Sequence, residues 1–171
     1  LVIGTDPGGS EKLRVGGGCG PSDEPFVNSL RDRLRAAGLL GEVEFCPNLD
    51  RAGKIAFLRS LSVFSVPASY GEAFGLYAIE ALAAGVPIVQ PRTAAFPELV
   101  EATGGGVLCE PGSADSLADA IEQLLLNPAQ ARALGEAGCR AVFEKFSAEV
   151  MARNMMAAFE EALRRSGAKA S

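Results

Sequence analysis

The stretch SYGEAFGLYAIEALAAGVPIV, residues 69–89, decides the fold class of this chain. It follows an apolar run at 63–66 that ends at a proline, and it opens with a glycine-containing turn. A helix-forming segment then runs from about Phe74 to Ala84, where Gly85 ends it, and a second apolar run follows at 86–90. The order strand, turn, helix, strand predicts a right-handed crossover between two parallel strands.

The same alternation extends to both sides of this stretch. Towards the N-terminus, the apolar pattern predicts strands around Leu13–Val15 and at 42–45, each followed by a helix. Towards the C-terminus, a short helix from Pro97 leads to a strand at 107–109, and only helices follow. These features predict an α/β fold, a doubly wound, Rossmann-like parallel sheet of about five strands with extra C-terminal helices. Such sheets bind their ligands at the carboxyl ends of the strands.

The length of the chain indicates a single domain. It has 171 residues, 48% of them hydrophobic, which is enough for one buried core. We expect residues 12–165 to form that domain. Residues 1–11 include the turn-rich segment TDPGGS and predict a linker or a truncated first element, so that the chain begins partway through a domain. Residues 166–171 predict a disordered tail.

The composition excludes several classes of function. A net charge of −5 offers no basic surface for a phosphate backbone, so we expect no nucleic-acid partner. The chain has no histidine, which removes Ser-His and Cys-His couples and the commonest metal ligand, and we expect no metal site. The four cysteines form no CxxC pair and predict reduced thiols and a cytoplasmic location. The longest apolar run, 81–89, is too short to span a bilayer.

The turn before the central helix has the chemistry of an anion-binding site. The first turn of a helix leaves amides without partners and carries a partial positive charge, which suits a phosphate. Gly75 has no side chain, so an oxyanion can approach the backbone closely. Two anions at one helix end repel each other, so we expect Glu72 to face something else. Sugar hydroxyls, which donate to carboxylates, fit that requirement.

A second carboxylate, Glu80, lies among apolar residues of the same predicted helix. Ionised and unpaired, it would destabilise the fold, so it needs a cation or several hydroxyl donors. A ribose diol supplies two such donors. A plainer interpretation remains open, in which Glu72 is a solvated loop residue and Glu80 pairs with Arg92 or Arg59.

The glycine-rich loop after the first predicted strand, GGGCGP at 16–21, does not match a dinucleotide-binding fingerprint. A G-x-G-x-x-G pattern that started at Gly16 or Gly18 would need its third glycine at Pro21 or Asp23. No Walker loop is present either. The acids at 42 and 44 near the next strand keep a dehydrogenase as an alternative.

Three segments together resemble a known family. They are PASYGEAFGLYAIEALAAGVPIVQP at 67–91, PELV at 97–100 and GGGVLCEPGSADSLADAIEQLLLNP at 104–128. The pattern resembles the carboxyl-terminal, nucleotide-sugar-binding domain of retaining glycosyltransferases of the GT-B fold. The likeness runs from about Lys12 to Leu163 and includes an E-x7-E motif. It implies that the chain is one half of a GT-B fold.

The resemblance assigns roles to the residues around the central helix. It implies that Glu72 is the catalytic residue, which contacts the transferred sugar near its reacting carbon. The amides of Phe74, Gly75 and Leu76 would hold the diphosphate, and Glu80 would bind the ribose. The substrate would be a nucleoside-diphosphate sugar, with no cofactor and no metal.

The resemblance also implies contacts with the nucleotide from two other loops. Cys46, Pro47 and Asn48 follow the second predicted strand and would contact the base. Gly17 and Gly18, in the glycine-rich loop, would line the same cleft. Where many family members have two glycines before Pro-Glu, this chain has AAF at 94–96, which changes the sugar-side contacts of that loop.

The resemblance implies a partner domain as well. Family members hold the diphosphate with an Arg and a Lys that precede the region of Lys12, and nothing in residues 1–11 matches them. They also have an amino-terminal, acceptor-binding domain. We therefore expect the donor-binding half of a hexosyltransferase, inactive alone, with any peripheral membrane association in the absent half. The alternatives are half of a nucleotide-sugar epimerase or a non-catalytic sugar-nucleotide-binding module.

Overall fold

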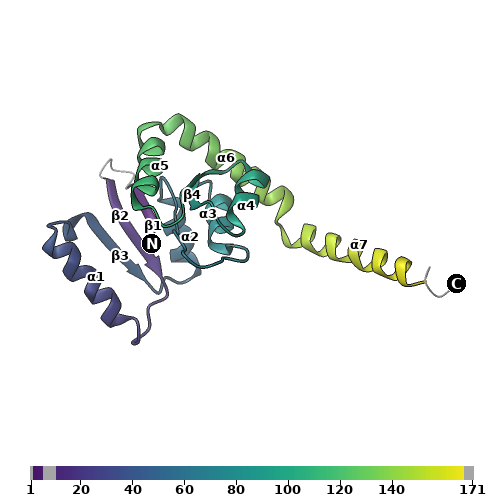
Figure 1. The fold of residues 1–171 in the computed structure, drawn as a ribbon, viewed down its shortest axis with the longest axis horizontal. Helices are drawn as coiled ribbons and strands as arrows, with labels where there is room; N and C mark the ends of the chain where they lie inside the picture. The colour runs from purple at the N-terminus through teal and green to yellow at the C-terminus, as the bar shows by residue number, and fades with distance from the viewer. Residues whose placement is uncertain (1, 6–10, 168–171) are drawn as a thin grey trace.

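A computed structural model describes residues 2–5 and 11–167 of the chain. Strands and helices are interspersed up to residue 109, with β1 followed directly by β2 and α2 by α3, and three helices follow (Figure 1). The elements, in chain order, are β1 (Val2–Thr5), β2 (Glu11–Gly17), α1 (Glu24–Ala36), the short 3-10 helix η1 (Leu40–Glu42), β3 (Val43–Pro47), α2 (Arg51–Arg59), α3 (Leu76–Ala83), β4 (Ile88–Pro91), α4 (Phe96–Thr103), β5 (Gly106–Cys109), α5 (Ala114–Leu126), α6 (Pro128–Lys145) and α7 (Ala148–Gly167).

The strands form two sheets, which differs from the single parallel sheet that the sequence predicts. The first has the order β1-β2-β3, with β1 antiparallel to β2 and β2 parallel to β3. The second consists of β4 and β5, which are parallel, with Ile88 opposite Gly106. The crossovers through helices are therefore as predicted, but the number and continuity of parallel strands are not.

The segment at 63–66, predicted as a strand, makes only one bridge. Phe64 pairs with Ile88 in parallel, with hydrogen bonds from its amide to the Pro87 carbonyl and from the Val89 amide to its own carbonyl, both 2.9 Å. Both edges of β2 are occupied, one by β3 and one by β1, so this segment does not pair with β2. Val63, Phe64 and Ser65 are nevertheless buried, as expected for a central strand.

The two ends of the chain are described only in part. Residues 2–5 form β1, so part of the segment predicted as a linker or truncated element is a strand. Leu1 and residues 6–10 lie outside the described residues, as do residues 168–171 of the predicted tail, whereas α7 continues to Gly167. Among the residues that the structure covers, no helix has both the length and the apolar character needed to cross a bilayer.

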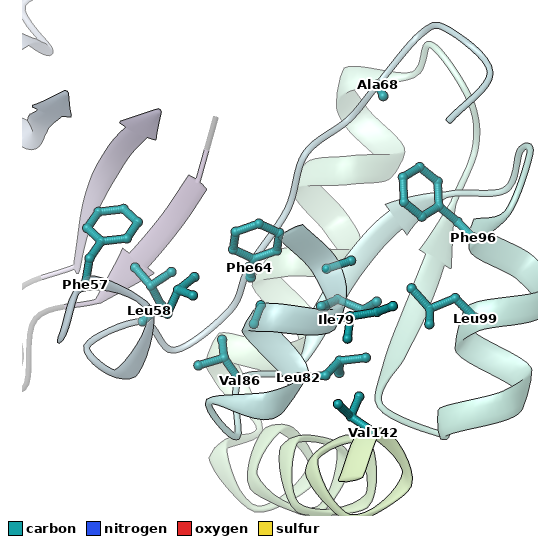
Figure 2. Packing of buried hydrophobic residues seen from close by; sticks show 14 residues of the cluster. Phe57, Leu58, Phe64, Ala68, Ile79, Leu82, Val86, Phe96, Leu99 and Val142 are labelled. Atoms are coloured by element: carbon teal, nitrogen blue, oxygen red, sulfur yellow. The ribbon is translucent and has the colours of Figure 1, made fainter. Parts of the chain in front are cut away.

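The main hydrophobic core surrounds α3. Figure 2 shows Ile79 and Leu82 of this helix lying among Phe64, Leu99 of α4 and Val142 of α6. Leu82 has no exposed surface and Ile79 only 8%. A second cluster fills the space between β4, β5 and α5, with Val63 and Leu124 among its buried members. Burial on several sides fixes α3, whose first turn bears the predicted anion site.

Glycines allow α6 to approach α3 and β5 closely. A Cβ atom on Gly138 would lie 2.5 Å from Leu82 Cδ2 and 3.0 Å from the Cα of Gly105. A Cβ on Gly135 would overlap the carbonyl oxygen of Gly85. These positions therefore require glycine for packing, and the contact holds the C-terminal end of α3 in place.

The last helix, α7, projects away from the rest of the molecule (Figure 1). Its side chains Met151, Met155, Phe159 and Leu163 recur at helical spacing. All four are more than half exposed. Within this chain, the stripe is therefore not part of the core.

Candidate functional site

A cavity of about 580 Å³ lies between the glycine-rich loop, α2 and α3. Residues from elements far apart in the sequence line it, including Gly17 and Gly18 after β2, Asn48 after β3, Lys54 on α2, and Glu80 on α3. Its apolar wall includes Phe57, Phe64 and Val66. The cavity is at the carboxyl ends of β2 and β3, where the sequence predicts the ligand.

Close packing between β2 and α2 forms one wall of this cavity. A Cβ on Gly16 would be 2.9 Å from Phe57 Cζ, so only glycine lets the loop lie directly over that ring. The guanidinium of Arg14 lies over the same ring, with its Cζ 5.1 Å from the ring centroid, and donates to Glu44 at 2.7 Å. The hydrogen bond from Arg14 holds the pKa of Glu44 below its ordinary value. The glycine loop thus packs on the Phe57 ring, which is also in contact with Arg14.

Asn48 holds the shape of the glycine-rich loop. Its side-chain amide donates to the Cys19 carbonyl and accepts from the Cys19 amide, both at 2.8 Å. Its backbone amide donates to the Gly17 carbonyl at 2.9 Å. The backbone of Asn48 has a positive φ of 54°, which asparagine tolerates better than most residues. Both ends of its side-chain amide therefore bind protein, although one face of the residue lines the cavity.

The two residues before Asn48 are placed differently from each other. Cys46 does not line the cavity; its sulfur lies 3.9 Å from Arg14 Nη2, and burial raises the pKa of its thiol. Pro47 lines a neighbouring hollow of about 430 Å³ that shares Gly17, Gly18 and Asn48 with the first. The structure thus brings Asn48 and the two glycines together, with Pro47 at their edge and Cys46 turned inward.

Glu80 forms an ion pair in the cavity. Its Oε1 lies 2.6 Å from Nζ of Lys54, and both side chains are slightly less than half exposed. The carboxylate thus has the cation that its apolar surroundings require, and that cation is a lysine of α2. The alternative pairing with Arg92 or Arg59 is wrong.

Glu72 lies on the amides at the start of α3. Its Oε1 accepts hydrogen bonds from the amides of Phe74 and Gly75, each at 3.2 Å. These bonds hold the pKa of Glu72 below its ordinary value. The sequence predicts that Glu72 faces away from these amides, and the structure differs. These two amides lie only two and three positions after Glu72, in the turn that leads into α3, so the carboxylate folds back onto them near the positive end of the helix.

The conformation of Gly75 shapes this turn. Its φ of +76° is left-handed, and a Cβ would lie 3.1 Å from Cε1 of Phe96. Glycine avoids both the backbone strain and that contact. The next two amides, of Leu76 and Tyr77, donate to no residue in the described part of the chain. They belong to the first turn of α3, at the positive end of the helix.

Tyr77 connects the two groups of predicted residues. Its ring lines the cavity beside Glu80, and its hydroxyl donates to Glu72 Oε2 at 3.1 Å. Burial, and then the hydrogen bond to Glu72, raise the pKa of Tyr77 well above its ordinary value. Phe74 and Leu76 lie outside the cavity lining and have exposed side chains, so only their amides are candidates for binding.

Two residues of the site, Lys54 and Tyr77, were not identified from the sequence. Lys54 belongs to a helix that the sequence predicts only as a scaffold, and its pairing with Glu80 spans 26 positions. Tyr77 is one residue into the central helix, five positions after Glu72, and that spacing alone indicated nothing. Only the packing of α2 against α3 brings both side chains to the cavity.

Comparisons with known proteins bear on the family of this chain. The family model described as glycosyl transferases group 1 matches residues 10–141. Phosphatidyl-myo-inositol mannosyltransferase from Mycobacterium leprae is 35% identical over 128 residues, which are 75% of this chain and 34% of that protein. The chain therefore spans about a third of the length of this curated relative.

Solved structures share the fold. Sucrose-phosphate synthase from Thermosynechococcus elongatus superimposes with a TM-score of 0.78 at 29% identity, over 90% of this chain and 39% of that one. HepE from Anabaena, solved with UDP and glucose, gives 0.75 at 21% identity, over 88% and 40%. The predicted α/β class, as one part of a GT-B structure, is confirmed. Since the family model covers most of the chain, this protein belongs to the glycosyl transferases group 1 family.

Proposed function

We propose that this chain binds the donor in an enzyme that transfers a hexose from a nucleoside-diphosphate sugar to an acceptor. The observation that carries the proposal is the 580 Å³ cavity, in which the glycine loop, Asn48 and Glu80 converge beside the amino end of α3. Because the chain spans only part of its relatives, the proposal concerns the full-length protein. An acceptor-binding partner domain, a cytoplasmic location and independence from metals remain predictions.

The nucleoside fits the chemistry of the cavity. Phe64 and Val66 offer apolar surface for a base, while the glycine loop lets a ligand approach the backbone. The carboxylate of Glu80 can accept hydrogen bonds from both hydroxyls of a ribose. Its partner Lys54 adds a positive charge next to the position of the diphosphate.

The diphosphate is proposed to bind at the start of α3. The amides of Leu76 and Tyr77 donate to no described residue and lie in the first turn of α3, at the positive end of the helix. The amides of Phe74 and Gly75 become available when the Glu72 carboxylate moves, and repulsion between the carboxylate and the diphosphate favours that move. Glu72 would then face the sugar.

The chemistry follows from these positions. As the bond between the anomeric carbon and the diphosphate breaks, negative charge builds on the leaving group and the helix amides stabilise it. A well-aimed donor of this kind is worth about 3–4 kcal/mol. Positive charge builds at the anomeric carbon, where the Glu72 carboxylate stabilises it and orients the sugar. Retention of configuration is implied by the family resemblance alone.

The relatives support the choice of probes. The Mycobacterium leprae relative is a mannosyltransferase by name, and the fold neighbour HepE is solved with UDP and glucose. We therefore choose UDP, GDP and ADP as the nucleotides for the first test.

The test is calorimetric titration of the full-length protein and its Glu80→Ala variant with these three nucleotides. Loss of a carboxylate that accepts two hydroxyl donors should weaken the nucleotide that binds by about tenfold or more. Glu122→Ala, on the exposed face of α5, is the matched control and should not change the affinity. Equal affinity in Glu80→Ala and the parent would remove the ribose role. Isomerised donor without acceptor would favour an epimerase.

A further inference from the structure

The Tyr77 hydroxyl is the only described side-chain group that donates to Glu72. Its hydrogen bond goes to Oε2, whereas both backbone hydrogen bonds go to Oε1. One oxygen of the carboxylate is thus held by backbone amides and the other by a side-chain hydroxyl. A movement that releases Oε1 from the amides leaves the bond to Oε2 available.

The position of this hydroxyl is fixed by the packing of its ring. The ring centroid of Tyr77 is 6.2 Å from that of Phe64 and 6.4 Å from that of Phe96. Phe64 is 3% exposed and Phe96 has no exposed surface, so neither ring can move aside without opening the core. Phe96 also lies against Gly75, on the other side of the same turn. The donor of the hydrogen bond is therefore more rigid than its acceptor.

We propose that Tyr77 is a positioning residue, which holds the Glu72 carboxylate at the sugar when the diphosphate of the donor takes over the helix amides. This inference rests on the proposed function. Glu72 leaves the amides of Phe74 and Gly75 but turns about its remaining bond to Tyr77. Without that bond, the carboxylate would move freely in solvent at the moment when it must face the sugar.

Tyr77 also lines the cavity in which the nucleoside is proposed to bind. A nucleotide that contacts Glu80 and the glycine loop therefore also contacts the ring whose hydroxyl holds Glu72. Occupation of the cavity and the position of the catalytic carboxylate are thereby linked through one side chain. Among the described residues that line the cavity, Tyr77 alone donates a side-chain hydrogen bond to Glu72.

The charged surroundings of Glu72 are simple, which makes the inference testable. In the described residues, Glu72 forms no ion pair, and its donors are the two amides and Tyr77. Tyr70 is the second titratable group nearby and acts on Tyr77 through its charge. Because the Tyr77 hydroxyl donates to the ionised carboxylate, its removal should raise the pKa of Glu72.

The first experiment measures that pKa directly. Carboxyl carbons of glutamate are labelled in the full-length protein, and the pKa of Glu72 is determined by NMR in the parent, in Tyr77→Phe and in Tyr70→Phe. The expected result is a higher pKa of Glu72 in Tyr77→Phe and no comparable rise in Tyr70→Phe, the other tyrosine of the cavity. The same pKa in Tyr77→Phe and the parent would overturn the inference, whatever the protein does with sugars.

The second experiment separates binding from turnover. Parent and Tyr77→Phe are titrated with UDP, GDP and ADP, and release of sugar to water from UDP-glucose, GDP-mannose and ADP-glucose is followed from acid to neutral pH. We expect the nucleotide affinity of Tyr77→Phe to lie within about threefold of the parent's and its kcat to be lower by about tenfold. The loss of kcat on the acid side of the pH profile should occur at a higher pH in Tyr77→Phe than in the parent.

The outcomes distinguish the two proposals. If the parent binds a nucleotide and releases its sugar, but Tyr77→Phe has the same kcat and the same pH profile, the role of Tyr77 is wrong and the proposed function stands. If the parent binds none of these nucleotides or donors, the proposed function fails, and the role of Tyr77 at a sugar fails with it.

Discussion

Lys54 and Glu80 form an ion pair across the candidate site, with 2.6 Å between Nζ and Oε1. The two residues belong to different helices, α2 and α3, and both line the cavity beside the glycine loop. The pair therefore has two consequences. It neutralises a carboxylate among apolar residues, and it places a cation where a nucleoside diphosphate would approach.

We expect Lys54→Met to weaken the binding of nucleoside diphosphates several-fold, because Glu80 is then an uncompensated negative charge close to the diphosphate. The free energy of unfolding should fall by less than about 1 kcal/mol, as is usual for half-exposed ion pairs. Calorimetric titration and urea denaturation measure the two effects. Lys12→Met, an exposed lysine outside the cavity lining, serves as the control. Tighter binding in Lys54→Met would instead mean that Lys54 competes with the ribose for Glu80.

The hydrogen bonds at Glu72 predict a pH-dependent stability. The amides of Phe74 and Gly75 favour the ionised carboxylate and hold its pKa below the ordinary 4.5. A depressed pKa contributes stability that is present above the unfolded value and is lost as the pH falls through the folded value. The stability advantage of the parent over Glu72→Gln should therefore be full at neutral pH and shrink below 4.5. Urea denaturation at about pH 7 and about pH 3.5 checks this. A difference that is the same at both pH values would show that the charge of Glu72 contributes nothing.

Gly75→Ala should destabilise the protein more than Gly85→Ala does. Both glycines have a left-handed φ, +76° and +80°, so each substitution introduces strain of about 1–2 kcal/mol. Only at Gly75 does the new methyl group also meet a side chain, that of the fully buried Phe96, at 3.1 Å. Midpoints of urea denaturation compare the two variants. Equal losses would mean that Phe96 adjusts without cost.

Gly138→Ala should lower the free energy of unfolding by about 1–3 kcal/mol, because α6 must move away from α3 and β5. The added methyl group would lie 2.5 Å from Leu82 Cδ2, and Leu82 has no exposed surface into which it can turn. Glu136→Ala, on the exposed face of the same helix, should change stability by less than about 0.5 kcal/mol. If alanine at 138 stabilised the protein through its higher helix propensity, the close packing of α6 would be wrong.

Two substitutions of Asn48 separate its side chain from its backbone. Asn48→Gly keeps the positive φ of 54° but removes both hydrogen bonds to Cys19, whereas Asn48→Ala also introduces backbone strain. Both should accelerate hydrogen exchange at the Cys19 amide. The alanine variant should be less stable than the glycine variant by about 1 kcal/mol. Unchanged exchange in Asn48→Gly would show that other contacts hold the glycine loop.

Local features of the fold could be predicted from the sequence because they depend on residues a few positions apart. Asp50 caps α2 through the Gly53 amide at 2.7 Å, and Ser147 accepts from the Val150 amide at the start of α7. The central helix begins at Leu76, two residues after the predicted start, because Gly75 is left-handed. The sheet was less predictable, since pairing of β1 with β2 and the lone bridge at Phe64 depend on which edges are free.

The candidate site shows the same division. Apolar neighbours indicated that Glu80 needs a cation or hydroxyl donors, and the structure supplies the cation. The identity of that cation could not be read from the sequence, because 26 positions separate it from Glu80. The orientation of Glu72 was also missed. The positive end of a helix attracts the nearest anion, and in this fold the nearest anion is the chain's own carboxylate.

The sequence by itself determined most of the order of strands and helices, the end of the central helix before Gly85 and the resemblance that proved to be the family. Short-range hydrogen bonds and hydrophobic periodicity carry that information within a few turns of chain. Only the tertiary structure decided that Lys54 meets Glu80 and that the Tyr77 hydroxyl reaches Glu72 from a ring held between two phenylalanines. These contacts depend on how α2, α3 and α4 pack, and packing is set by the shapes of side chains that the linear pattern does not relate to one another.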